Sequence, residues 1–254
     1  MAINHLKDES IDKRSPVPMY YQIMRQILDK IQRGEFAVDS ALPPEQELAK
    51  TYKVSRMTVR QAIVELVNEG ILKRRKGIGT FVAHPKIEQA LSRLTSFTED
   101  MTLRGMKAGA RVISFEEIVP ETSIRKTLGL GAGDKAFECV RVRLADGEPM
   151  ALETTTLPVS LYPQLARQDL ENRSLYDLLA ERCGIRLDYA MQSIEPTCAS
   201  SYEAALLHVA SGAPLLLMHR ISYNQETHAV EHVKSLYRGD RYKFMIELRR
   251  KPSL

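Results

Sequence analysis

The sequence predicts an α+β protein of two domains, a small helical domain that ends in a β-hairpin and a larger domain built on an antiparallel sheet. At 254 residues the chain is long for one hydrophobic core and suits two domains. Apolar residues recur at helical spacing in the first third, whereas strand-like and helix-like segments alternate beyond it. A polar, unpatterned stretch around Pro85 sets the expected boundaries, with domains at residues 1–84 and 93–254 and a linker at 85–92.

Composition excludes several classes of protein. The chain is 44% hydrophobic and 27% charged, as ordinary globular proteins are. Its apolar runs fall far short of the ~20 residues that span a bilayer, and residues 1–10 hold no signal-peptide core, so we expect a cytoplasmic protein with no membrane partner. Cys139, Cys183 and Cys198 are odd in number and widely spaced, which favours reduced thiols over a disulfide or zinc framework.

The basic excess of the chain lies in its first third. Residues 1–84 carry 14 lysines and arginines against 10 acidic residues, whereas residues 85–254 carry 22 of each. A basic patch can recognise a partner only where it gathers on one face. Taken alone, the bias fits a solvated surface as well as a nucleic-acid interface.

Three short helices are expected in the first domain. The first runs from about Tyr20 to Gly34, with isoleucines at every fourth residue of one face. The second begins near Pro44, because proline suits a first turn, and ends near Tyr52. Ser55 is a good N-cap for the third helix.

The tight turn between the second and third helices predicts a helix-turn-helix. In that motif the N-terminal side chains of the second helix meet base edges in the major groove. Arg56 and Arg60 share a face there, and an arginine can form two hydrogen bonds to a guanine, while Thr58 can contact a thymine methyl or a phosphate. The alternative is an ordinary solvated helix face.

Strand periodicity follows at residues 71–76 and 80–82, about a glycine turn at 77–79, and predicts a basic hairpin, or wing. Four consecutive cations, Lys73 to Lys76, would contact phosphates or enter a minor groove, an electrostatic contribution that weakens with salt. The turn lacks the third glycine and the following helix of a dinucleotide-binding fingerprint.

The motifs LPPEQELA at 42–49, VSRMTVRQA at 54–62 and GIGTFV at 77–82 resemble the GntR family of bacterial repressors across nearly the whole first domain. The resemblance implies a winged helix-turn-helix that binds a palindromic double-stranded operator as a homodimer. With Ser55 at the start of the reading helix and Lys76 in the wing, the expected DNA contacts are Gln46, Ser55, Arg56, Thr58, Arg60, Lys76 and Gly77. The family commonly has arginine where this chain has Gln46, which puts one strong contact in doubt.

The second domain is expected to be a mostly antiparallel α+β fold. Strands are predicted at residues 111–119, 136–144, 149–157, 187–196, 215–223, 229–237 and 244–248. Helices are predicted at residues 123–130, 175–183 and 201–209. Alternation places Arg141 and Arg143 on one face of their strand, and Glu231 and Tyr237 on one face of theirs. The arginines are either surface charge or, if they line a cavity, a clamp for phosphate or carboxylate.

The second domain resembles the HutC-type effector (UTRA) domain found in many GntR repressors, through LTSFTEDM at 94–101, the pair Arg141 and Arg143, SLY at 174–176 and the strand at 231–237. The resemblance implies a six-stranded antiparallel sheet like that of chorismate lyase, without its catalysis. In members that respond to amino-sugar phosphates, the phosphate is held at the positions of Phe97, Thr98, Arg141, Arg143, Ser174 and Tyr176, and the sugar at those of Glu153, Glu231 and Tyr237.

The expected effector is therefore a small anionic metabolite, with glucosamine-6-phosphate or N-acetylglucosamine-6-phosphate first in order. Other members of the subfamily respond to histidine-pathway acids, other sugar phosphates or alkylphosphonate-related compounds, and these remain alternatives. No cofactor or catalytic residue is expected, because the sequence holds no nucleophile elbow, P-loop or H-E-x-x-H signature. No metal is expected, because His228 and His232 lie in a predicted strand and have no obvious third ligand. Two other classes of protein remain as alternatives: an enzyme that retains lyase-like chemistry in its second domain, and a DNA-binding protein that responds to no ligand.

Overall fold

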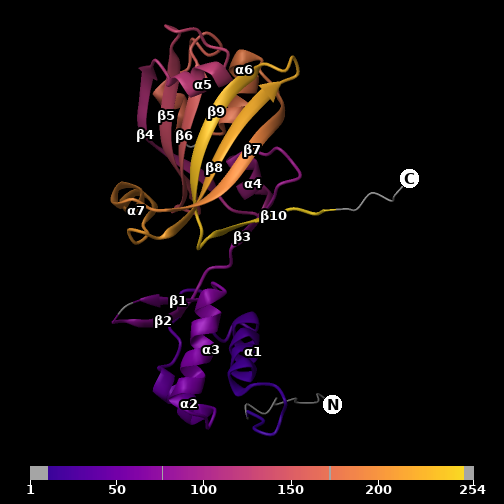
Figure 1. The fold of residues 1–254 in the computed structure, drawn as a ribbon, viewed down its shortest axis with the longest axis vertical. Helices are drawn as coiled ribbons and strands as arrows, with labels where there is room; N and C mark the ends of the chain where they lie inside the picture. Colours follow the sequence, from indigo (N-terminus) through magenta and orange to yellow (C-terminus); the bar gives the residue numbers. More distant parts are fainter. Residues whose placement is uncertain (1–10, 76, 172, 249–254) are drawn as a thin grey trace, which may run out of the picture. The chain divides into compact units, whose positions relative to one another are not determined.

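The computed structural model describes residues 11–75, 77–171 and 173–248. The chain divides into two compact units, Met1–Lys86 and Ile87–Leu254, whose elements are labelled in Figure 1. Among the described residues, no helix is both long and apolar enough to cross a membrane.

The first unit holds the three expected helices and the hairpin. The helices are α1 (Met19–Gln32), α2 (Glu45–Thr51) and α3 (Arg56–Asn68), and the antiparallel hairpin is formed by β1 (Leu72–Arg75) and β2 (Gly79–Val82). Ser55 caps α3 as predicted, since its hydroxyl accepts a hydrogen bond from the Thr58 amide at 3.1 Å. The winged helix-turn-helix arrangement predicted from the sequence is therefore present.

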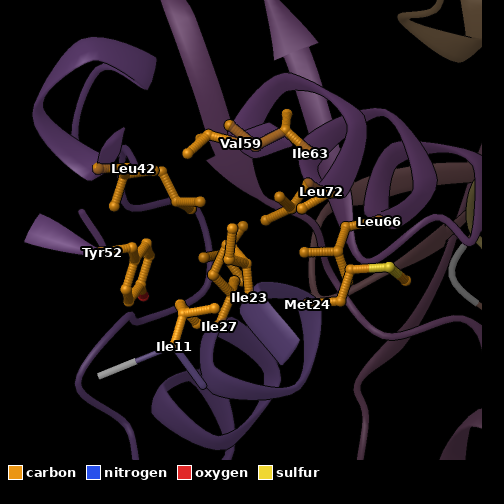
Figure 2. Packing of buried hydrophobic residues seen from close by; sticks show 13 residues of the cluster. Ile11, Ile23, Met24, Ile27, Leu42, Tyr52, Val59, Ile63, Leu66 and Leu72 are labelled. Atoms are coloured by element: carbon orange, nitrogen blue, oxygen red, sulfur yellow. The ribbon is translucent and has the colours of Figure 1, made fainter. Parts of the chain in front are cut away.

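A single apolar cluster fixes α3 in the first unit. Ile23 and Ile27 of α1 are fully buried and pack with Ile63 and Leu66 of α3, as Figure 2 shows. Burial of each such side chain contributes roughly 1.5–3 kcal/mol. Because these residues occupy one face of α3, the opposite face is left to solvent.

The second unit is built on a six-stranded antiparallel sheet with the strand order β4-β5-β6-β9-β8-β7. Its strands are β4 (Ala108–Ile118), β5 (Ala136–Ala145), β6 (Glu148–Pro158), β7 (Leu187–Cys198), β8 (Pro214–Asn224) and β9 (Ala229–Arg238). Its helices are α4 (Phe97–Leu103), α5 (Thr122–Thr127), the 3-10 turn η1 (Arg167–Leu170), α6 (Leu175–Cys183) and α7 (Ser201–Leu207). The α+β class and the six-stranded sheet are confirmed.

Two elements differ from the sequence prediction. Residues 87–90, placed in an irregular linker, form the strand β3 (Ile87–Ala90), which pairs in parallel with β10 (Tyr242–Met245). The partner overlaps the strand predicted at residues 244–248, but it lies at the far end of the chain, and local periodicity cannot show which strands pair. Helix α4 was also missed, although Ser96 and Glu99 form the capping box that marks a helix start.

The two faces of the sheet bury different kinds of side chain. One face carries Val142 and Leu236 in an apolar cluster with Leu207 of α7. The other face carries one apolar cluster that includes Leu175 and Leu179 of α6 and another that includes Phe97 and Met101 of α4. Polar side chains of β5, β6 and β9 lie between these last two clusters, and they form the site described next.

Candidate functional site

Helix α3, which is expected to enter the major groove, and the neighbouring helix α2 present most of the expected DNA contacts to solvent. Gln46 of α2 and Ser55, Arg56 and Arg60 are exposed, and Thr58 is half-buried. The buried residues of α3, Val59, Ala62, Ile63 and Leu66, lie on its other face. The exposed side chains at the start of α3 are thus accessible to solvent.

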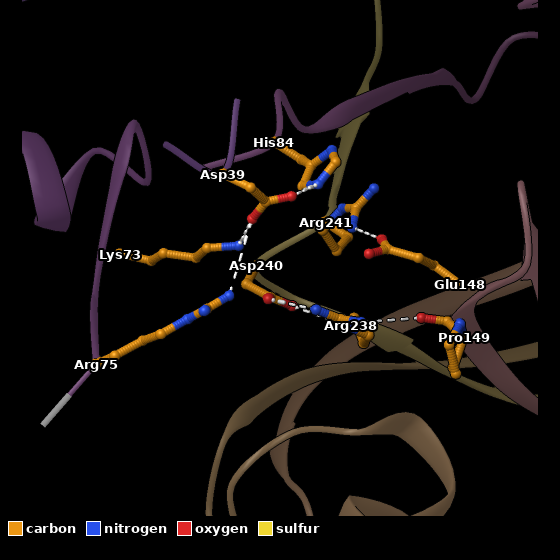
Figure 3. Close-up of polar contacts among 9 residues, drawn as sticks. All are labelled: Asp39, Lys73, Arg75, His84, Glu148, Pro149, Arg238, Asp240 and Arg241. Atoms are coloured by element: carbon orange, nitrogen blue, oxygen red, sulfur yellow. Dashed lines mark hydrogen bonds and ion pairs between the residues drawn. The ribbon is translucent and has the colours of Figure 1, made fainter. Parts of the chain in front are cut away.

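The wing is tied back to the rest of the first unit by acidic side chains. Asp39 pairs with Lys73, lies 3.9 Å from the Arg75 guanidinium and lies 2.6 Å from the Nε2 atom of His84, as Figure 3 shows. The hydrogen bond from Lys73 is the main reason that the pKa of Asp39 lies below its usual value. These two wing cations therefore share an ionised carboxylate, and their expected contact with DNA phosphates stays a prediction.

Two of the expected DNA contacts, Lys76 and Gly77, directly follow β1 in the chain. Lys76, one of the expected DNA contacts, lies outside the described residues. Gly77 is exposed and has a φ of +76°, a left-handed conformation that glycine adopts without steric cost. The turn that brings the chain back into β2 therefore depends on this glycine.

A cavity of about 40 Å³ lies in the second unit, between the sheet and helices α4 and α6. Its apolar lining comes from Phe97, Leu175, Met218 and Val233. Its polar lining comes from Gln89, Thr95, Ser96, Thr98, Arg141, Arg143, Glu153, Thr155, Tyr176, Arg220, Glu231, Ser235 and Tyr237.

Two buried arginines dominate one wall of this cavity. Arg141 donates to a Glu153 carboxylate oxygen at 2.5 Å, and Arg143 donates to the Thr98 hydroxyl at 3.1 Å while its guanidinium stacks 4.7 Å from the Phe97 ring centre. The Nε and Nη1 atoms of Arg141 and the Nε atom of Arg143 are buried without a hydrogen-bond partner among the described residues. Such donors are costly to leave unpaired, and an anion would satisfy them.

The two acidic residues of the cavity have opposite electrostatic environments. Burial alone would raise the pKa of Glu153, but the charges of Arg141 and Arg143 outweigh it and hold that pKa below its usual value. Burial raises the pKa of Glu231, which accepts hydrogen bonds from Ser222 at 2.6 Å and from Tyr176 at 3.0 Å. One carboxylate therefore neutralises part of the arginine charge, while burial disfavours the charged form of the other, and both effects leave the cavity favourable to anions.

Eight of the nine expected effector residues line this cavity. The ninth, Ser174, instead caps α6, where its hydroxyl accepts from the Asp177 amide at 3.3 Å. Sequence reasoning missed Arg220, which donates to Gln192 at 2.8 Å and to the Tyr176 hydroxyl at 3.1 Å. Its alternation with Met218 and Ser222 along β8 was the available signal.

The histidines that raised the question of a metal do not converge. His228 pairs with Glu226 at 3.4 Å, whereas the His232 ring lies 5.7 Å from that of His219. Within the part of the chain that the structure describes, no group of three or more His, Cys, Asp or Glu side chains is arranged to hold a metal ion.

Comparison with known proteins gives matches to both units. Residues 19–82 match the model of the bacterial regulatory proteins of the gntR family, and residues 103–243 match that of the UTRA domain. The HTH-type transcriptional repressor NagR of Bacillus subtilis is 46% identical over 93% of this chain and 97% of its own length.

More distant relatives share the same architecture. The mannosyl-D-glycerate transport/metabolism system repressor MngR of Escherichia coli is 33% identical over 93% of this chain and 98% of its own length. The crystal structure of PhnF from Mycobacterium smegmatis is 35% identical and superposes with a TM-score of 0.65, covering 90% of this chain and all of that one.

Proposed function

The chain belongs to the GntR family of bacterial transcription regulators, as a repressor of the HutC type with a UTRA domain, and on this basis we propose that a small phosphorylated amino sugar controls its affinity for DNA. Glucosamine-6-phosphate and N-acetylglucosamine-6-phosphate are the proposed effectors. Binding of either would release the protein from its operator.

The first unit supplies the DNA contacts. Arg56 and Arg60 project from the exposed face of α3, and the wing adds further positive charge. As a homodimer, the protein would place two such helices in successive major grooves, about 34 Å apart on a palindromic operator.

The buried Arg141 and Arg143 pair is the observation that carries the effector proposal. Unpaired guanidinium donors in an enclosed cavity match the oxygens of a phosphate. Glu231 and Tyr237, which line the same cavity from β9, can exchange hydrogen bonds with sugar hydroxyl or amino groups. These are the positions that the family resemblance assigns to phosphate and sugar.

The choice of an amino sugar rests on the family resemblance and on the similarity to NagR, which is greater than that to MngR. Relatives named for other metabolites keep a second candidate open, namely another sugar phosphate or small acid. Ligand pockets usually enclose about 300–1,000 Å³, so a hexose phosphate must widen this cavity of about 40 Å³ as it binds.

Calorimetry and gel shifts with the full-length protein test the proposal. The DNA is a duplex selected from random sequence by the protein itself, and the ligands are the two amino-sugar phosphates, fructose-6-phosphate, mannosyl-D-glycerate and inorganic phosphate. We expect the amino-sugar phosphates to bind most tightly, to release the duplex and to be recovered unchanged. Release by another ligand alone would replace the effector, and formation of a product would favour the enzyme reading.

A further inference from the structure

Gln89 is a polar side chain buried at an inward position of an otherwise apolar strand face. In β3, Ile87 and Gln89 are buried, whereas Glu88 and Ala90 are exposed. Gln89 is 6% exposed, and its Oε1 atom is buried with no hydrogen-bond partner among the described residues. An unpaired buried amide destabilises a fold, so packing alone does not explain a glutamine here.

The Gln89 amide lines the same cavity as the unpaired atoms of Arg141. Gln89 and Arg220 also line a second hollow, of about 490 Å³, which extends along β7. Both residues therefore lie between the cavity and the second hollow, and a shift of either side chain would join the two spaces. An amide offers both a donor and an acceptor, so it can pair with a phosphate oxygen or with a hydroxyl group.

Strand β3 is held by its pairing with β10, by the burial of Ile87 and by contacts of Glu88. Within the described residues its sheet has two strands, β3 and β10, which lie side by side in Figure 1. The Glu88 carbonyl accepts from Arg104 at 2.6 Å, and the Glu88 carboxylate pairs with Lys243 at the surface, also at 2.6 Å. Ile87 and Tyr242 anchor the pair in the apolar cluster of α4, so the polar end of β3 at Gln89 is the part that an added hydrogen bond would stabilise.

The strand begins where the first unit ends. Lys86 is the last residue of that unit, three residues before Gln89, and three extended residues span only about 10 Å. A ligand that bonds to Gln89 would thus act on the segment that leads to the DNA-binding unit. No longer chain of packed side chains is needed to carry the effect.

We propose that Gln89 binds the effector directly and that this bond fixes β3, which couples occupancy of the cavity to the DNA-binding unit. This inference rests on the proposed function and adds to it a contact and a route of regulation.

The test compares Gln89→Leu with Gln225→Leu, the same change at an exposed glutamine of the β8–β9 turn. With glucosamine-6-phosphate as the probe, we expect Gln89→Leu to bind at least about tenfold more weakly, as the loss of a hydrogen bond to a charged group predicts. Affinity for the selected duplex without ligand should stay unchanged, and the melting temperature without ligand should be equal or higher.

Hydrogen exchange supplies a readout that a purely structural role would not move. In the wild type, saturating glucosamine-6-phosphate should slow exchange of the amides of residues 87–91, where the Ile87 and Leu91 amides bond to Arg241 and Met245 carbonyls. In Gln89→Leu, saturation with the same ligand should leave the exchange rates of these amides as they are without ligand.

The outcomes separate the two proposals. A wild type that binds none of the phosphosugars overturns the proposed effector, and the role of Gln89 falls with it. A responsive wild type with an equally responsive Gln89→Leu variant overturns the role of Gln89 alone. Weaker binding with normal protection of residues 87–91 at saturation overturns the coupling.

Discussion

Glu45 and Arg56 form an ion pair that joins the start of α2 to the start of α3, with 3.2 Å between the Glu45 Oε2 and Arg56 Nε atoms. The other carboxylate oxygen of Glu45 lies 3.4 Å from the Arg74 guanidinium in β1. One carboxylate thus holds an arginine of the reading helix and an arginine of the wing. The Arg56 side chain is still 69% exposed, so the pair orients it while leaving it accessible.

Replacement of Glu45 by glutamine is expected to reduce the sequence discrimination of DNA binding. The change removes a negative charge beside the proposed DNA contacts and frees two arginines from a fixed arrangement. Binding to random duplex should strengthen by about fivefold, while binding to the selected duplex should gain less. Fluorescence anisotropy with both duplexes measures the ratio, and Glu47→Gln is the control in the same helix. An unchanged ratio in Glu45→Gln contradicts the positioning role.

Charge reversal at Arg56 and Arg60 is expected to weaken binding of the selected duplex by about 100-fold or more, because each arginine that pairs with a base contributes about 1–3 kcal/mol. The slope of affinity against salt should also become shallower. The control reverses Arg25 and Arg33, which are exposed on or just after α1, and so changes the net charge equally. Equal losses in the two variants would show that overall charge, and not the reading helix, governs binding.

The sequence predicted those features of the site that depend on local periodicity. Alternation along β5 placed Arg141 and Arg143 on one face, and the structure has both in the cavity wall. Periodicity could not show that Arg220 of β8 lines the cavity, because strand order depends on contacts between distant parts of the chain, whereas the resemblance had already assigned Phe97 and Thr98 of α4 to the site. Gln89 escaped for the same reason, since the partner of β3 is the last described strand.

The structural role of Ser174, in contrast, could be predicted from its local sequence alone. The resemblance to a family assigned it to phosphate, and in this structure its hydroxyl accepts a hydrogen bond from the Asp177 amide, so the phosphate contact stays a prediction. A serine before a helix is a strong N-cap signal by itself. This local signal predicts the capping bond that Ser174 makes at the start of α6.

Arg141→Lys is expected to abolish the response to amino-sugar phosphates while leaving DNA binding intact. Lysine keeps the positive charge beside Glu153 but loses the planar fork that can hold two phosphate oxygens. Affinity for glucosamine-6-phosphate should fall by at least about tenfold in calorimetry. Arg111→Lys, at an exposed arginine of β4, is the matched control. If operator binding falls together with effector binding, the substitution has damaged the fold.

Glu231→Gln is expected to raise the stability of the second unit near neutral pH. Burial raises the pKa of Glu231 from its ordinary value of 4.5 in the folded protein. Its favourable contribution is therefore complete below about pH 4.5, where both folded and unfolded chains are protonated, and is lost as the pH rises toward the folded pKa. Glutamine stays neutral throughout and can still accept the hydrogen bonds from Ser222 and Tyr176.

The gain in melting temperature of Glu231→Gln should consequently be a few degrees at pH 7 and close to zero at about pH 4. Glu116→Gln, at an exposed position of β4, should show no such dependence. An equal gain in melting temperature at both pH values would mean that packing, and not ionisation, causes the difference in stability between the variant and the wild type. Because Glu231 lines the cavity, the same variant also tests the sugar contact: a neutral amide that preserves affinity for glucosamine-6-phosphate would indicate that the protonated acid is the form that meets the ligand.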